Sequence, residues 1–130
     1  MTPSKRAYFD KQVKWVLERL PKKVKNLLEE IPLHVEDRPS RHLVRDIKMK
    51  PNTDLCGCFV GIPLGEKYNW QAQTPNTIIL FRRGIYALAA NEHGTCNRSE
   101  LRRQIRITIL HELGHFHGLN ENQLEQLGYG

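Results

Sequence analysis

The sequence has no long apolar run. The chain has 130 residues, and no apolar stretch in it approaches the roughly 20 consecutive residues needed to span a membrane. The first residues, MTPSKRAYFDKQVKWVLERLP, carry basic side chains throughout and lack the unbroken apolar segment of a secretory signal. We therefore expect no membrane partner and a cytoplasmic location.

Cysteine is also scarce. An odd count of three, without a signal segment, argues against a disulfide framework. Cys56 and Cys58 stand two apart in an expected strand and would share one face. That spacing could hold a second metal ion, but it is not the C-x-x-C spacing of structural zinc sites. We favour reduced cysteines that pack in the core, where free cysteine is most often found.

Acidic residues are outnumbered, with 14 Asp and Glu against 20 Lys and Arg. Residues 1–50 hold 13 basic and 7 acidic side chains, while residues 51–130 hold 7 of each, so the net charge of +6 comes from the first fifty residues. Such a region could attract an acidic substrate, an acidic partner or nucleic acid. No nucleic-acid motif or interleaved aromatic residues accompany it. We favour a solvated helix face, keep an acidic partner as the alternative, and do not expect nucleic acid as a partner.

The composition is that of an ordinary globular protein, with 39% hydrophobic and 26% charged residues. We expect a single domain over residues 1–130, which is long enough to bury roughly two thirds of the surface of the unfolded chain. Hydrophobic periodicity and turn signals predict its elements. They are helices at 9–20, 21–30 and 85–90, strands at 31–36, 55–64 and 77–81, a helix that begins at a capping box of Asn97 and Glu100, and a terminal helix from Asn120.

One stretch near the end, ITILHELGHFHGLNE at residues 107–121, contains the order H-E-x-x-H. On a helix, residues four apart have Cβ atoms roughly 5–6 Å apart, so the imidazoles of His111 and His115 can hold one metal ion. Zinc suits this geometry. Glu112 lies about 100° around the helix from His111, where its carboxylate can reach the water that the metal activates. This arrangement is typical of metallopeptidases in which Glu is the general base.

A third ligand is expected shortly after the second histidine. Gly118 can end the helix and turn the chain back, and Glu121 then offers an oxygen ligand that leaves the fourth position open for water. Alternatively, Asn120 is an N-cap and Glu121 belongs to the first helical turn, where the helix dipole favours an acid with or without metal. We favour the ligand. His117 lies roughly opposite His115, so we expect it to pack or to form a hydrogen bond.

The full pattern is H-E-x-x-H-x-x-G-x-x-E, and it resembles the small bacterial zincin-like metallopeptidases. The resemblance extends to three earlier segments in the same order, LHVEDRP (33–39), GCFVGIPLGE (57–66) and PNTIILFR (75–82). It implies an α+β, minimal zincin-like fold with an N-terminal helix, a small mixed sheet, a buried active-site helix and a short C-terminal helix. Members of the family commonly carry Asp at the third ligand position, so Glu121 is one methylene longer.

We therefore predict a zinc-dependent metallopeptidase with one zinc ion on His111, His115 and Glu121 and with Glu112 as the general base. The nine residues after Glu121 leave room only for a shallow cleft, so small or unfolded peptides are the expected substrates. Their backbone would pair with an edge strand, either 55–64 or 77–81. Tyr68 and Tyr129 are candidates for stabilising the oxyanion.

Two other functions remain open. The chain could be a catalytically weak or inactive metal-binding module that docks a partner through its basic N-terminal region. It could also be a basic nucleic-acid binder in which the motif occurs by accident, and we rank this reading last.

Overall fold

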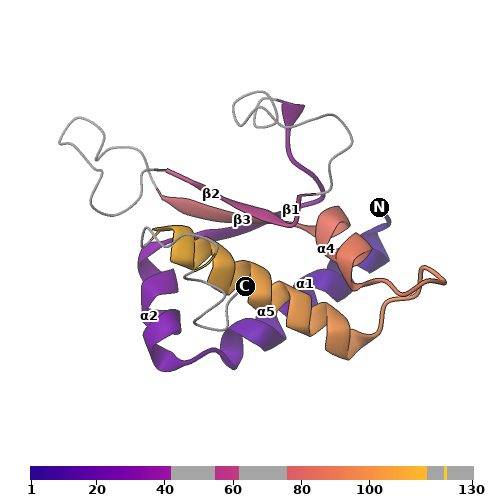
Figure 1. The fold of residues 1–130 in the computed structure, drawn as a ribbon, viewed down its shortest axis with the longest axis horizontal. Helices are drawn as coiled ribbons and strands as arrows, with labels where there is room; N and C mark the ends of the chain where they lie inside the picture. Colours follow the sequence, from indigo (N-terminus) through magenta and orange to yellow (C-terminus); the bar gives the residue numbers. More distant parts are fainter. Residues whose placement is uncertain (42–54, 62–75, 117–121, 123–130) are drawn as a thin grey trace.

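The computed structural model describes residues 1–41, 55–61, 76–116 and 122. Helices and strands follow one another within these ranges in the order that the sequence predicts (Figure 1). They are α1 (Pro3–Glu18), α2 (Lys22–Glu30), β1 (Leu33–Glu36), β2 (Gly57–Val60), β3 (Thr77–Phe81), α4 (Arg82–Ala89) and α5 (Arg98–Phe116). The expected C-terminal helix lies almost wholly outside the described residues. The α+β class is confirmed.

The three strands form a small mixed sheet in the order β1-β3-β2. Strand β1 runs parallel to β3, and β2 runs antiparallel to it. Side chains alternate across a pleated strand, and on β3 the fully buried Ile78 and Leu80 alternate with the half-buried Ile79. On β1 the exposed His34 and Glu36 lie on the face away from the core, as their alternation with apolar residues predicts. One face of the sheet therefore carries the core.

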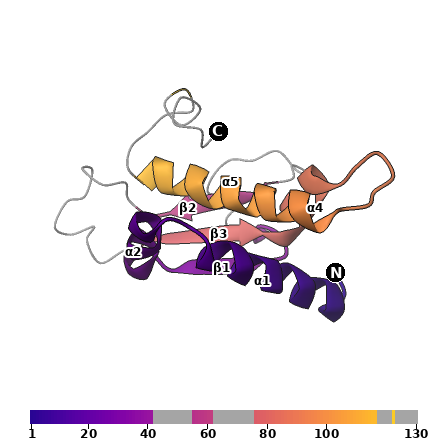
Figure 2. The same cartoon turned by 90° about the horizontal axis from the view of Figure 1, so that it is seen from below.

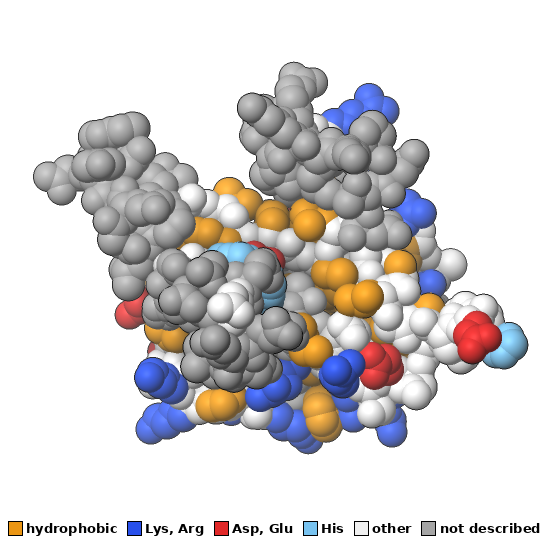
Figure 3. All heavy atoms as spheres, viewed as in Figure 1, with side chains coloured by type: hydrophobic (Ala, Val, Ile, Leu, Met, Phe, Trp, Pro, Cys, Tyr) orange, Lys and Arg blue, Asp and Glu red, His pale blue; other side chains and the backbone are white. Residues whose placement is uncertain are grey.

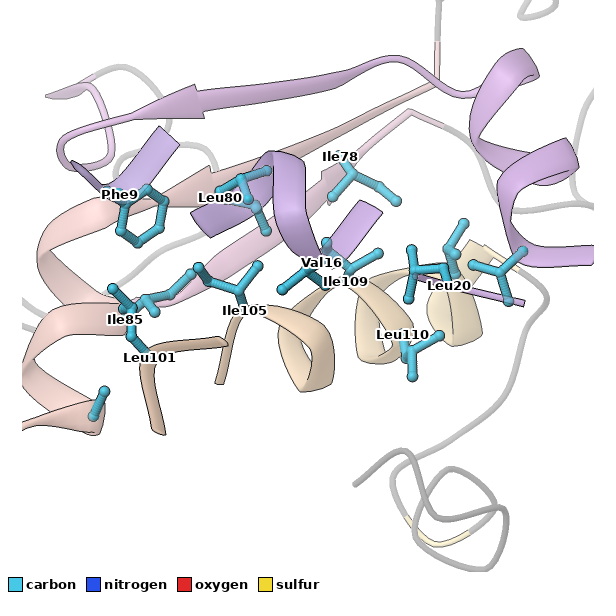
Figure 4. Close-up of a cluster of buried hydrophobic side chains, with 14 of the residues drawn as sticks. Phe9, Val16, Leu20, Ile78, Leu80, Ile85, Leu101, Ile105, Ile109 and Leu110 are labelled. Atoms are coloured by element: carbon cyan, nitrogen blue, oxygen red, sulfur yellow. The ribbon is translucent and has the colours of Figure 1, made fainter. Parts of the chain in front are cut away.

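The helices lie on that face (Figure 1), and α1 and α5 run side by side across it when the molecule is seen from below (Figure 2). Helix α5 is central, because it contacts β2, β3, α1 and α4. Buried apolar side chains from all these layers meet in one core (Figure 4). Among those labelled there are Phe9, Val16, Leu20, Ile78, Leu80, Ile85, Leu101, Ile105, Ile109 and Leu110. None of the described helices is long and apolar enough to cross a membrane.

Helix α5 begins where the capping box predicts. The Asn97 side-chain oxygen accepts a hydrogen bond from the backbone N–H of Glu100 at 2.7 Å, which satisfies one of the N–H groups that a helix start leaves without a partner. Leu101, Ile105 and Ile109 then recur along one face and are fully buried. The helix that carries H-E-x-x-H is thus fixed at its start by a cap and along its length by the core.

Helix α4 begins at Arg82, three residues earlier than expected. The Arg82 guanidinium donates to Asp10 of α1 at 2.9 and 3.0 Å and to Asp37, just after β1, at 3.0 Å. Arg6 of α1 donates to the same Asp37 carboxylate at 2.6 and 2.9 Å. These contacts, which join distant parts of the chain, hold the first turn of α4 directly against the end of β3. They could not be inferred from local periodicity.

Candidate metal centre

The spacing of H-E-x-x-H on α5 brings its three polar side chains together. Each of His111, Glu112 and His115 offers a ligand atom, and these atoms lie within 4.8 Å of one another. The two imidazole centroids are 4.6 Å apart, with their planes at 81°. Residues four apart share a helix face, so this geometry follows from the local sequence once α5 forms.

The cluster lies where the core meets the surface. Glu112 is only 8% exposed, while His111 and His115 are half-buried. Figure 3 shows histidine and acidic side chains reaching the surface together on one face of the molecule. A carboxylate held in such a place has little freedom to turn away, and its neighbours shield it from bulk water. Both properties favour directed proton transfer by a side chain.

Strand β2 packs along the helical turns that bear the motif. Gly57 lies against Thr108, and a Cβ atom added at Gly57 would come within 2.7 Å of the Thr108 Cγ2. Further along α5, the ring of Phe116 lies 5.5 Å from that of Phe59, centroid to centroid. The two contacts lie before and after the metal-ligand cluster along α5. The sequence allows either a bulge or a close backbone approach at the two glycines of this strand, Gly57 and Gly61, and the structure shows the close approach at Gly57.

The sheet order decides which strand offers an edge beside the cluster. Strand β3, the expected strand 77–81, has a partner on each side, so its backbone groups are engaged in the sheet. Strand β2 pairs only with β3 among the residues that the structure describes. The prediction that an extended peptide pairs with the strand 77–81 is therefore wrong. The other candidate, the strand 55–64, stays a prediction.

The two cysteines near this strand are not part of any metal-ligand group within the described ranges. Both are half-buried, and Cys56 packs against the core. Burial raises the pKa of the Cys58 thiol to about 11, and the negative charges of Glu112 and Glu36 add to the increase. The contact of Cys56 with the core agrees with the packing role favoured from the sequence.

The donor set of the cluster fits zinc. Zinc binds imidazole nitrogen at about 2.0–2.1 Å, and His111 and His115 present two such nitrogens close together on a buried helix, with the Glu112 carboxylate beside them. The proposed third ligand, Glu121, lies outside the described residues, as do His117 and Gly118. The two candidates for the oxyanion, Tyr68 and Tyr129, lie outside them as well.

Sequence reasoning did not find the contacts that position the cluster. The periodicity of the sequence predicts that Thr108 and Phe116 lie on a helix. It does not predict which residues they contact. What distinguishes them is their contact with Gly57 and Phe59 on β2, some fifty residues earlier in the chain. The glycine was the available signal, since a glycine inside a strand often marks a close approach by another element.

A buried helix with two imidazoles and a carboxylate, lying beside the edge strand of a small mixed sheet, defines the zincin class of metal centre. Comparison with known families agrees with this assignment. Residues 28–130 match the family described as zincin-like metallopeptidase, and the chain belongs to that family. No curated protein matches the chain. The family implies a bound metal ion, typically zinc, and the cluster could bind one.

Proposed function

We propose that the protein is a zinc-dependent peptidase. The observation that carries the proposal is the group formed by His111, Glu112 and His115, whose ligand atoms lie within 4.8 Å of one another on a buried helix. In the proposed site His111 and His115 hold one zinc ion and Glu121 completes the ligand set. The family match over residues 28–130 supports the same reaction class.

The chemistry divides between the ion and the chain. When bound, zinc supplies Lewis acidity, which lowers the pKa of a water ligand to about 7 and polarises the scissile carbonyl. Glu112 takes the proton of the attacking water and delivers it to the leaving amine. Its position next to His111, rather than four residues from it, keeps its carboxylate beside the ligand pair and available for this proton transfer.

The proposed substrates are small or unfolded peptides. An extended peptide can add to a sheet edge through its main-chain groups, and β2 offers such an edge alongside α5. Its contacts at Gly57 and Phe59 bracket the metal-ligand cluster. A peptide that paired there would pass the cluster with its backbone carbonyls aligned along the strand. A folded protein has few unpaired strands to offer, so an unfolded segment suits this edge best.

Zinc content and peptide cleavage test the proposal together. The wild-type protein is expected to contain about one zinc per chain by mass spectrometry, and the His111→Ala/His115→Ala variant to contain none. Glu112→Gln is expected to keep zinc but to lower the turnover of quenched-fluorescent peptides by about 10²–10⁴-fold. Gln preserves the size and shape of the side chain but cannot accept the proton.

Glu92→Gln is the matched control, because Glu92 is an exposed acid in the turn before α5. It is expected to cleave at the wild-type rate. Equal cleavage by wild type and Glu112→Gln would assign the activity to a contaminant. A zinc-loaded wild type that cleaves none of a broad set of peptides would instead support the metal-binding interaction module.

A further inference from the structure

A groove of about 460 Å³ lies between the C-terminal half of α1 and the N-terminal half of α5. Its floor includes the apolar side chains of Trp15 and Val16, and five of its eight lining residues are arginines. They are Arg19, Arg98, Arg102, Arg103 and Arg106. We call this feature the arginine groove. Figure 3 shows basic side chains with apolar ones between them along the lower edge of the molecule, below α5 in the view of Figure 1.

The groove is built around one aromatic ring. The guanidinium carbons of Arg19 and Arg102 lie 4.0 and 3.7 Å from the centroid of the Trp15 ring. Two guanidiniums therefore pack against one aromatic ring. These cation–π contacts hold both arginines in place.

Positive charge in the groove is poorly balanced. Arg103 pairs with Glu100 at 3.1 Å and Arg19 pairs weakly with Glu18 at 3.9 Å, whereas Arg102 donates to a neutral partner, the Gln12 side chain, at 2.7 Å. Arg98 and Arg106 are exposed, and neither has an acidic partner within the described ranges. Burial lowers the pKa of Arg102, and the charges of Arg98 and Arg19 lower it further. The groove therefore attracts anions.

The arginines of α5 also have a regular spacing. Arg98, Arg102 and Arg106 are four residues apart, which separates them by about 6 Å along the helix. In an extended peptide, side chains on one side recur every second residue, about 6.6 Å apart. Carboxylates at alternate positions of a peptide would therefore meet successive guanidiniums. Each guanidinium presents a planar fork that matches a carboxylate in a bidentate pair.

The groove is separate from the metal centre. Arg102 and His111 are nine residues apart, which places them about 180° from each other around α5. Trp15 of α1 and Arg19, which caps its C-terminus, precede the family match over residues 28–130, whereas the four arginines of α5 lie within it. The groove therefore lies on the side of α5 opposite to the cluster that is proposed to carry the peptidase chemistry.

We propose that the arginine groove docks an extended acidic segment of another protein, in which Asp or Glu recurs at alternate positions. The carboxylates pair with Arg98, Arg102 and Arg106, and Trp15 acts by holding the Arg102 guanidinium in place. Docking here does not depend on a metal ion and is distinct from binding at β2.

Fluorescence anisotropy tests the docking. The probe is a labelled peptide in which Glu and Ser alternate, compared with the same peptide carrying Gln for Glu. Wild type is expected to bind the Glu peptide selectively, with an affinity that falls as salt is added. The variant Arg98→Gln/Arg106→Gln is expected to bind about tenfold more weakly. Both side chains are exposed, and circular dichroism checks that the variant is folded.

Arg38→Gln/Arg83→Gln is the matched control, since it removes the same charge from exposed arginines that do not line the groove. It is expected to change the affinity less than about twofold. The His111→Ala/His115→Ala variant is expected to bind like wild type, so loss of zinc and loss of docking are separate results.

Three outcomes would overturn the proposal. The first is equal binding of the Glu and Gln peptides by the wild-type protein. This comparison does not depend on whether any variant folds. The second is full affinity in Arg98→Gln/Arg106→Gln. The third is tighter binding of a single-stranded oligonucleotide than of the Glu peptide, with displacement of the peptide. The surface would then be a nucleic-acid site.

Discussion

Asp37 accepts hydrogen bonds from two arginines that lie far apart in the chain. Arg6 of α1 and Arg82 of α4 both donate to its carboxylate, and Arg82 also binds Asp10. The hydrogen bonds from Arg6 are the main cause that lowers the pKa of Asp37 from its ordinary value of 3.8, and those from Arg82 add to the shift. One side chain thus joins α1, β1 and α4.

We predict that this pairing gives the protein acid-dependent stability. At pH values between the lowered pKa of Asp37 in the folded protein and its ordinary pKa in the unfolded chain, the unfolded state binds more protons than the folded state. The stabilisation is therefore complete above about pH 4 and is lost as the pH falls through the folded pKa. Asp37→Asn removes this contribution, so the variant is expected to melt below wild type at neutral pH and to lose less of its melting temperature on acidification.

Melting temperatures measured from pH 7 down to pH 3 by circular dichroism check this prediction. Glu29→Gln, a change at an exposed acid of α2, serves as the control and should follow the wild-type curve. If Asp37→Asn and wild type lose stability in parallel, the ion pairs at Asp37 do not contribute to acid stability.

At the scale of whole elements, the contact between β2 and α5 sets the position of the metal-ligand cluster. It depends on the absence of a side chain at Gly57, because an added Cβ would approach the Thr108 Cγ2 to 2.7 Å and the Ile79 carbonyl oxygen to 3.0 Å. Thr108 cannot easily rotate away, since its hydroxyl donates to the Gln104 carbonyl at 2.8 Å and a β-branched side chain has few rotamers in a helix.

We predict that Gly57→Ala destabilises the protein by about 1–3 kcal/mol, the usual cost of overpacking a core. Peptide cleavage should also fall, because β2 and the cluster move apart. Urea unfolding and cleavage assays measure the two effects.

The double variant Gly57→Ala/Thr108→Ser separates this contact from a general effect on the strand. Ser keeps the hydroxyl but removes the clashing methyl group, so part of the lost stability should return, with a coupling energy of about 0.5–3 kcal/mol. Strictly additive effects of the two changes would mean that the Gly57–Thr108 contact does not limit the approach of β2 to α5.

At the scale of the whole molecule, metal binding and folding are linked. A ligand that binds only the folded state stabilises it by about 2.7 kcal/mol at a concentration one hundred times its Kd. The two histidines are brought together only when α5 is helical, and α5 gains most of its stability from packing in the folded core, so zinc should favour the folded protein. We predict that zinc raises the melting temperature of metal-free wild type by roughly 5–10 °C.

Differential scanning fluorimetry of protein stripped with a chelator, with and without added zinc, checks this prediction. The His111→Ala/His115→Ala variant should show no increase. An equal increase in that variant would place the stabilising zinc elsewhere on the chain.

The sequence by itself determined the features that depend on neighbours within a few turns of the chain. Periodicity and capping predicted α2, α5 and the part of α1 from Phe9 onward, and alternation predicted β1. The spacing of His111, Glu112 and His115 predicted their cluster, because a helix brings residues four apart onto one face whatever surrounds it. The family resemblance followed from the same local patterns.

Only the tertiary structure decided which strand borders the cluster, because strand order depends on pairing between segments far apart in the chain. It also decided where positive charge gathers. Counted along the chain, the excess of basic over acidic residues belongs to residues 1–50. Only one arginine of the groove, Arg19, comes from that region, and the other four come from α5. Charge counts follow sequence distance, whereas the electrostatic potential follows distance in space. Packing of α1 against α5 turned two ordinary charged helix faces into one basic groove.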